Sequence, residues 1–192
     1  MFGAILEFIA HLNRAWQVPN SVFSFRIFGV SSFEALIFYA PMTLFILVLY
    51  EHFFDKDINH RLSPNILYAV LPGLLTYATI LMIYFSNPSG LIFSHSYLKM
   101  GLAAIAPLAL QIILKPRLIP KYCKLALLIF PIFFITELIG IKFNYWLFPG
   151  SEYLGKVTFL GQTFPVEEII FWMLLYPAAI ACYYEEFIDD NK

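Results

Sequence analysis

The longest stretch without Asp, Glu, Lys or Arg covers residues 62–98. This stretch is too long for one helix across a bilayer, which needs about 20 residues, and residues 86–90 (SNPSG) supply turn-forming residues inside it. Hydrocarbon offers no hydrogen-bond partners to the backbone, so an apolar segment within it must form a helix or a closed barrel. The sequence therefore predicts membrane-spanning helices on both sides of a turn.

The other charge-poor runs complete this pattern. They predict five spanning helices near residues 33–54, 64–85, 95–114, 123–146 and 164–185, and a short or partial N-terminal helix within residues 2–16. Charged residues make up 13% of the chain, against about 25% in soluble domains. The net charge of -1 provides no basic surface for nucleic acid. We expect an all-α integral membrane bundle of about six helices, forming a single membrane domain over residues 1–192.

The basic residues are divided unevenly between the two sets of loops. The richer set contains Lys56, Arg61, Lys115, Arg117, Lys121, Lys124 and Lys192. Loops rich in Lys and Arg stay on the cytoplasmic side of a membrane. The sequence therefore predicts an integral protein of a bacterial-type inner or cell membrane, with its C-terminus in the cytoplasm.

Two parts of the chain resemble each other. Glu7, Trp16 and Pro19 recur 130 residues later as Glu137, Trp146 and Pro149, and after a four-residue adjustment Glu34 and Tyr50 recur as Glu168 and Tyr184. The pattern predicts an N-terminally curtailed first copy over about residues 1–56, a linker helix over 64–85, and a second copy over about 95–190. Because one period contains four helices, the copies should be parallel and related by an axis along the membrane normal.

Four acidic residues lie inside or at the ends of the predicted spans: Glu34, Glu137, Glu167 and Glu168. Charged side chains in hydrocarbon are costly and usually functional, and a carboxyl group kept neutral there can serve as a general acid. Pro165 and the two acids after it also fit an ordinary helix start. No metal-ligand spacing or nucleotide-binding motif is present, so we expect neither a metal nor a cofactor.

Residues 161–172, which read GQTFPVEEIIFW, resemble the PxEE signature and following aromatic run of the integral-membrane lycopene cyclase domain. Trp146 and Pro149 match a Trp and a Pro that this family places before the signature, and its fused members contain two parallel copies of the domain. The resemblance is strongest over residues 130–185. The first copy departs from it, because residues 31–34 read SSFE where Pro-x-Glu-Glu is expected.

This resemblance implies an isomerase that closes the end groups of a membrane-dissolved linear carotenoid. The reaction is redox-neutral: an acid protonates the terminal alkene, a neighbouring double bond closes the ring, and a base removes a proton. The implied catalytic residues are Glu167, Glu168, Glu34 and Glu137. Aromatic faces can stabilise the carbocation, and the implied substrate-binding residues are Pro165, Phe164, Phe171, Trp172, Tyr145 and Trp146.

Two other functions remain compatible with the sequence. A small proton-coupled transporter would also place acids inside a bundle of repeats, although residues 35–50 and 169–184 offer few polar side chains for an aqueous route. A non-catalytic membrane subunit that completes a partner cyclase would account for the altered first copy. Association into homo- or hetero-oligomers is left open.

Overall fold

The structure is a computed structural model that describes residues 2–27, 29–55, 63 and 66–188. Within these ranges four helices are long and apolar enough to cross a membrane, namely Phe33–Asp55, Ile66–Ser86, Ser96–Leu114 and Pro116–Lys142. The predicted all-α membrane class with about six helices is confirmed.

The elements follow one another along the chain with short connections. They are α1 (Phe2–Leu12), β1 (Arg26–Ile27), β2 (Ser31–Ser32), α2 (Phe33–Tyr50), η1 (Glu51–Asp55), α3 (Ile66–Ser86), η2 (Pro88–Leu91), α4 (Ser96–Leu114), η3 (Pro116–Leu118), α5 (Ile119–Lys142), β3 (Lys156–Phe159), β4 (Gln162–Pro165), η4 (Glu168–Leu175), α6 (Tyr176–Tyr183) and η5 (Tyr184–Ile188). The π-helical segment η1 extends α2, and the last helix runs from η4 through α6 into η5.

Two of the expected helix boundaries are wrong. The helix expected over 123–146 ends at Lys142, and residues 164 and 165, expected to begin the last helix, form the end of strand β4. Strands β3 and β4 pair as an antiparallel hairpin, as do β1 and β2. Both hairpins are short loop structures whose strands lack a long alternation of polar and apolar residues.

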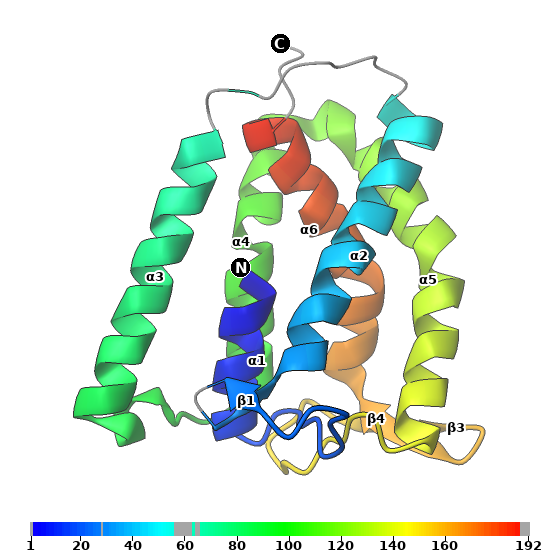
Figure 1. Ribbon diagram of the computed structural model, residues 1–192. Helices are drawn as coiled ribbons and strands as arrows, with labels where there is room; N and C mark the ends of the chain where they lie inside the picture. The colour runs from blue at the N-terminus through cyan, green and yellow to red at the C-terminus, as the bar shows by residue number, and fades with distance from the viewer. Residues whose placement is uncertain (1, 28, 56–62, 64–65, 189–192) are drawn as a thin grey trace.

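The helices run side by side, with the two hairpins at one end of the bundle and the C-terminus at the other (Figure 1). We call these the hairpin end and the tail end. Helix α1 begins at about mid-height and runs to the hairpin end. Helix α3 stands at the edge of the bundle, where Tyr84 packs edge-on against Phe8 of α1 with ring centroids 5.0 Å apart.

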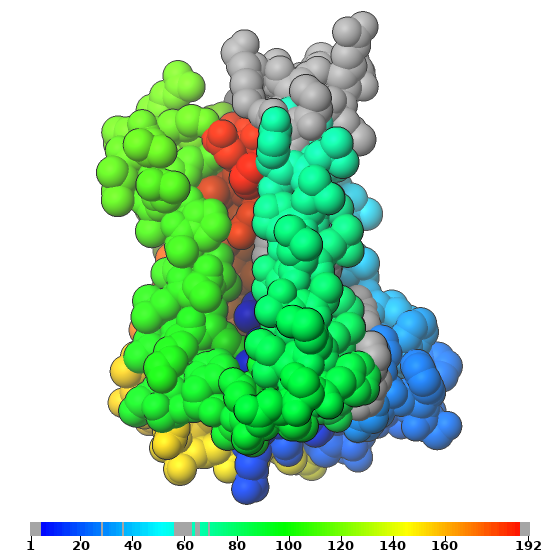
Figure 2. All heavy atoms as spheres, turned by 90° about the vertical axis from the view of Figure 1, so that its left-hand side faces the viewer, coloured from blue at the N-terminus to red at the C-terminus, as the bar shows by residue number. Residues whose placement is uncertain are grey.

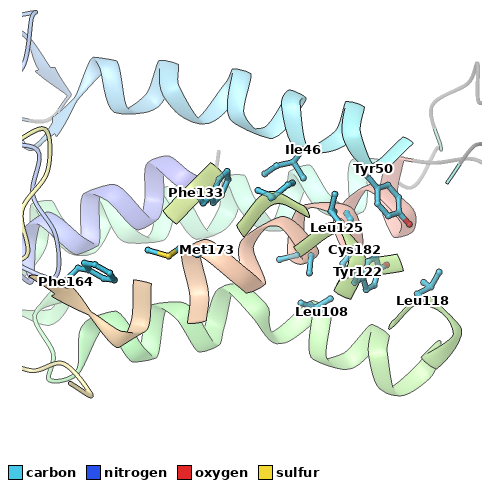
Figure 3. Close-up of a cluster of buried hydrophobic side chains, with 14 residues drawn as sticks. Ile46, Tyr50, Leu108, Leu118, Tyr122, Leu125, Phe133, Phe164, Met173 and Cys182 are labelled. Carbon is cyan, nitrogen blue, oxygen red and sulfur yellow. The ribbon is translucent and has the colours of Figure 1, made fainter. Parts of the chain in front are cut away.

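The main hydrophobic core lies between α2, α4, α5 and the last helix (Figure 3). Ile46, Leu125 and Met173 are fully buried there. Helix α6 contributes a row of small buried side chains, Ala178, Ala179 and Ala181. Small residues let helices approach closely in a membrane, so α6 can pack against both α4 and α5.

The π-helical segment η4 precedes a proline, Pro177, in the first turn of α6. Proline has no backbone N–H and interrupts the regular hydrogen-bond pattern of an α-helix. Single π-helical turns within helices are frequent at functional sites. Here the π-helical segment begins at Glu168, one of the acids singled out from the sequence.

Candidate functional site

Glu168 lies at the hairpin end, where η4 packs against α4. Its side chain is buried, and its carboxyl group accepts a hydrogen bond from the hydroxyl of Tyr97 on α4. A glycine permits this close packing, because a Cβ atom on Gly101 would lie 2.4 Å from the ring of Phe171. The two helices can therefore meet closely enough for Tyr97 to reach Glu168.

Glu137 lies in the last turns of α5 and is only 2% exposed. Its Oε1 accepts a hydrogen bond of 2.8 Å from the indole Nε1 of Trp146. The chain turns back after α5 through Asn144, whose φ is 56°, and the indole comes to lie over Gly140. A Cβ atom on Gly140 would be 2.1 Å from Trp146 Cζ2, so only glycine leaves room for the ring.

Glu7 lies in α1 in the same local structure. It too is 2% exposed, and its Oε2 accepts a hydrogen bond of 2.7 Å from the indole Nε1 of Trp16. The chain turns back after α1 through Arg14, whose φ is 59°, and the buried Ala10 stands where Gly140 stands in α5. In both places the Glu and the Trp are nine residues apart.

The two Glu–Trp pairs are joined directly. The residues after each Trp, Gln17 and Leu147, exchange two backbone hydrogen bonds of 2.9 and 2.8 Å. The hydroxyl of Tyr153 donates to the carbonyl of Ala15 over 2.8 Å. Trp16 also packs against Tyr97, the partner of Glu168, with ring centroids 5.0 Å apart.

These contacts bring three carboxyl groups into one buried region, and we call Glu7, Glu137 and Glu168 the carboxyl cluster. Glu137 and Glu168 lie close enough to interact electrostatically. Within the described residues, none of the three takes part in an ion pair of 4.0 Å or less. Their hydrogen-bond donors are neutral, two indoles and a phenol. Glu7 Oε1 is buried and accepts no hydrogen bond within the described residues.

Glu167 and Glu34 lie next to this cluster in the sequence pattern but have different contacts. Glu167 is fully buried, and its Oε1 accepts a 2.7 Å hydrogen bond from the backbone N–H of Leu154, before the β3–β4 hairpin. Glu34 accepts from the backbone N–H of Phe23 over 2.8 Å and from the hydroxyl of Ser21. Each thus binds the loop before its own hairpin. In its contacts Glu34 resembles Glu167, whereas the sequence pattern paired it with Glu168.

The aromatic residues expected around the substrate are only partly gathered. Trp172 stacks between Phe133 and Tyr176, with ring centroids 4.8 Å from each. Phe164, Pro165 and Phe171 are buried close to the hairpin end of the bundle. Tyr145 is 55% exposed and its ring faces Phe143, so the structure does not bring it to the carboxyl cluster.

Sequence reasoning missed Glu7, Trp16 and Tyr97 as site residues. The 130-residue offset contained a signal for the first two, because it aligns Glu7 with Glu137 and Trp16 with Trp146. Tyr97 carries no such signal. It reaches Glu168 across 71 residues of chain, and only the packing of α4 against η4 places it there.

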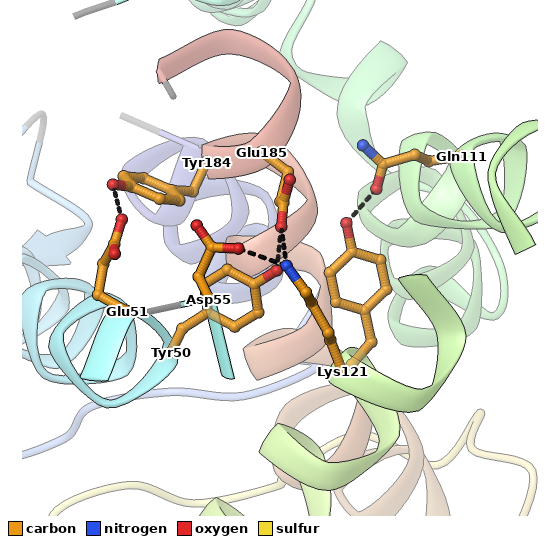
Figure 4. A network of polar contacts seen from close by, with 8 residues as sticks. Tyr50, Glu51, Asp55, Gln111, Lys121, Tyr184 and Glu185 are labelled. Carbon is orange, nitrogen blue, oxygen red and sulfur yellow. Dashed lines mark hydrogen bonds and ion pairs between the residues drawn. The ribbon is translucent and has the colours of Figure 1, made fainter. Parts of the chain in front are cut away.

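Acidic residues also gather at the tail end, but with different partners (Figure 4). Lys121 forms ion pairs with the buried Asp55 and, over 3.5 Å, with Glu185. The Tyr50 hydroxyl donates to Glu185, and the Tyr184 hydroxyl donates to Glu51. We call these six residues the tail-end network. It connects the end of α2, the start of α5 and the end of the last helix.

Within the described ranges, no group of three or more His, Cys, Asp or Glu residues is arranged to hold a metal ion. No family model matches the chain, and no curated protein or solved structure is significantly similar to it.

Proposed function

We propose that this protein is a carotenoid end-group cyclase that works within the membrane. The carboxyl cluster carries the proposal: three buried carboxyl groups lie at one end of an apolar bundle, and the hydrogen-bond donors that contact them are neutral. Acids of this kind suit proton-initiated chemistry on an apolar substrate. The resemblance of residues 161–172 to the lycopene cyclase signature supports the same assignment.

In the proposed reaction Glu168 is the proton donor. Its carboxyl O–H bond breaks as a C–H bond forms on the terminal alkene, and the carbocation is attacked by a double bond further along the chain. The new C–C bond closes the ring and moves the positive charge to a ring carbon, which then loses a proton to a carboxylate. Glu137, close to Glu168, lets the pair share the proton that is delivered.

Aromatic faces beside the cluster would stabilise the cation. The stack of Phe133, Trp172 and Tyr176 continues from the hairpin end toward the middle of the bundle. A cation over an aromatic face gains about 0.5–2 kcal/mol. Glu167 and Glu34 act in this proposal by fixing the two loops before the hairpins against the starts of η4 and α2.

A linear carotenoid dissolved in the bilayer has to enter the bundle from the side. A furrow between α3 and α4 is visible in the space-filling view, with parts of α1 and α6 in its floor (Figure 2). Large apolar side chains are exposed on both flanking helices, among them Leu75 and Met82 on α3 and Leu102 and Leu110 on α4. This surface supports a substrate that arrives from lipid.

Production of the protein in a host that makes lycopene tests the proposal. We expect wild-type protein to convert the linear pigment to a cyclic one, and Glu168→Gln to reduce ring formation by about 10²–10⁴-fold, the usual loss for a general acid. Glu51→Gln, which changes an acid of the tail-end network, serves as the matched control and should stay close to wild type. Pigments are extracted and the protein in the membrane is quantified. Uncyclised pigment with well-expressed wild-type protein would contradict the proposal.

We also propose that the tail end faces the cytoplasm. Helix η3, with Arg117, lies at this end together with the C-terminus, whereas Lys156 lies in β3 at the hairpin end (Figure 1). In a Cys123→Ser background, which removes the exposed native thiol, a membrane-impermeant thiol reagent applied to intact cells should label Lys156→Cys. It should label Arg117→Cys only after permeabilisation. The reverse pattern would contradict this orientation.

A further inference from the structure

The reaction proposed above leaves one requirement open. Glu168 gives up a proton to the alkene and a carboxylate elsewhere takes one from the ring cation, so the proton has to return to Glu168 before the next turnover. A site enclosed by apolar helices offers little water for this step. Groups that could accept the proton and return it should therefore lie within the buried region itself.

Glu7 is the member of the carboxyl cluster with a free acceptor atom. Its Oε2 is held by the indole of Trp16 over 2.7 Å, while its Oε1 is buried and receives no hydrogen bond within the described residues. A buried oxygen without a partner costs about 1–3 kcal/mol. Such an atom in a native structure calls for an explanation, and proton acceptance during a reaction provides one.

Tyr39 lies where it can connect Glu7 with Glu168. Its phenol interacts with the carboxyl groups of both residues. Independent packing contacts support this placement: Thr43, one helical turn further along α2, lies 3.3 Å from the hydroxyl of Tyr176. Residues four apart share a helix face, so Tyr39 points to the same interior face, on the hairpin side of that contact.

We propose that Glu7 is the proton acceptor of the cyclisation and that Tyr39 returns the proton to Glu168. The ring cation loses a C–H proton to Glu7 Oε1, and its C–H electron pair becomes the new ring double bond. The phenol of Tyr39 then gives its own proton to the Glu168 carboxylate and takes the proton from Glu7. The cycle restores every group and consumes no other reactant. This inference rests on the proposed function, since it assigns residues within the same reaction.

The two residues predict different kinetic defects. Glu7→Gln removes the acceptor, so ring formation should fall by about 10²-fold or more already in the first turnover. Glu7→Asp should recover part of that loss because it restores a carboxylate. Tyr39→Phe keeps both carboxyl groups, so its first turnover should match wild type and only later turnovers should slow. A purely structural role for Tyr39 would slow both phases equally.

The measurement uses the full chain in lipid vesicles of phosphatidylcholine and phosphatidylglycerol that contain lycopene. Excess protein over pigment gives the first turnover, and excess pigment gives the steady state. Glu51→Gln is again the matched control. If wild type forms rings but Glu7→Gln stays within threefold of it, or if Tyr39→Phe slows the first turnover as much as later ones, the inference is wrong while the proposed function stands. If wild-type protein forms no ring, the proposed function itself fails.

Discussion

The two ends of the bundle both contain buried or half-buried acidic residues but give them different partners. At the tail end, Lys121 contacts Asp55 and Glu185 directly. At the hairpin end, the donors to the carboxyl cluster are indole and phenol groups. The same residue type therefore joins helices through charge at one end, and at the other end remains available for proton transfer.

The difference has a physical basis in what each partner leaves behind. An ion pair holds its members in the charged state, and removal of one member leaves the other charge buried without compensation. A neutral donor commits the carboxyl group to neither state. Acids with only neutral donors can therefore gain and lose protons without disturbing an ion pair that holds the fold together.

Lys121→Met gives the largest expected change in stability. It leaves Asp55, whose side chain is 2% exposed, without its cation. Breaking a buried ion pair costs about 3–5 kcal/mol, and we expect the lower part of that range because Lys121 itself is partly exposed. The free energy of unfolding in detergent micelles, measured by titration with a denaturing detergent, checks this value.

A second substitution tests whether charge is the cause. In the double variant Lys121→Met with Asp55→Asn no buried carboxylate remains opposite the missing lysine, so about half or more of the lost stability should return. A loss below about 1 kcal/mol for Lys121→Met, the usual value for an exposed ion pair, would show that the tail-end network does not hold the helices through charge.

Trp146→Phe gives the smaller expected change. It removes the indole N–H that donates to Glu137 but leaves no opposite charge behind. The loss of a hydrogen bond between neutral groups costs about 0.5–1.5 kcal/mol. The same unfolding experiment should therefore show a clearly smaller destabilisation than that of Lys121→Met.

Trp172→Phe is the matched control for ring size, because it removes the same atoms from an indole that stacks on Phe133. The difference between the two tryptophan variants isolates the hydrogen bond to Glu137. If Trp146→Phe destabilises the protein as much as Lys121→Met beyond this control, the two ends do not differ in the way proposed.

The helices were predictable because their signal is local. Helix α4 was expected over residues 95–114 and spans Ser96–Leu114, and α3 was expected over 64–85 and spans Ile66–Ser86. The hairpins were not predictable, because β1 and β2 have two residues each and too few positions for a period of two to be visible. The early end of α5 at Lys142 depends on the turn through Asn144 that returns Trp146 to Glu137.

By itself the sequence determined the membrane class and the position of the helices, because a bilayer forces each apolar segment to satisfy its own backbone. It also contained both Glu–Trp pairs, which close over nine residues. Only the tertiary structure decided which acids meet. Tyr97 reaches Glu168 because Gly101 lets α4 approach Phe171 closely, and Glu34 is left with its own loop. Contacts between distant segments depend on how whole helices pack, and no local pattern encodes that.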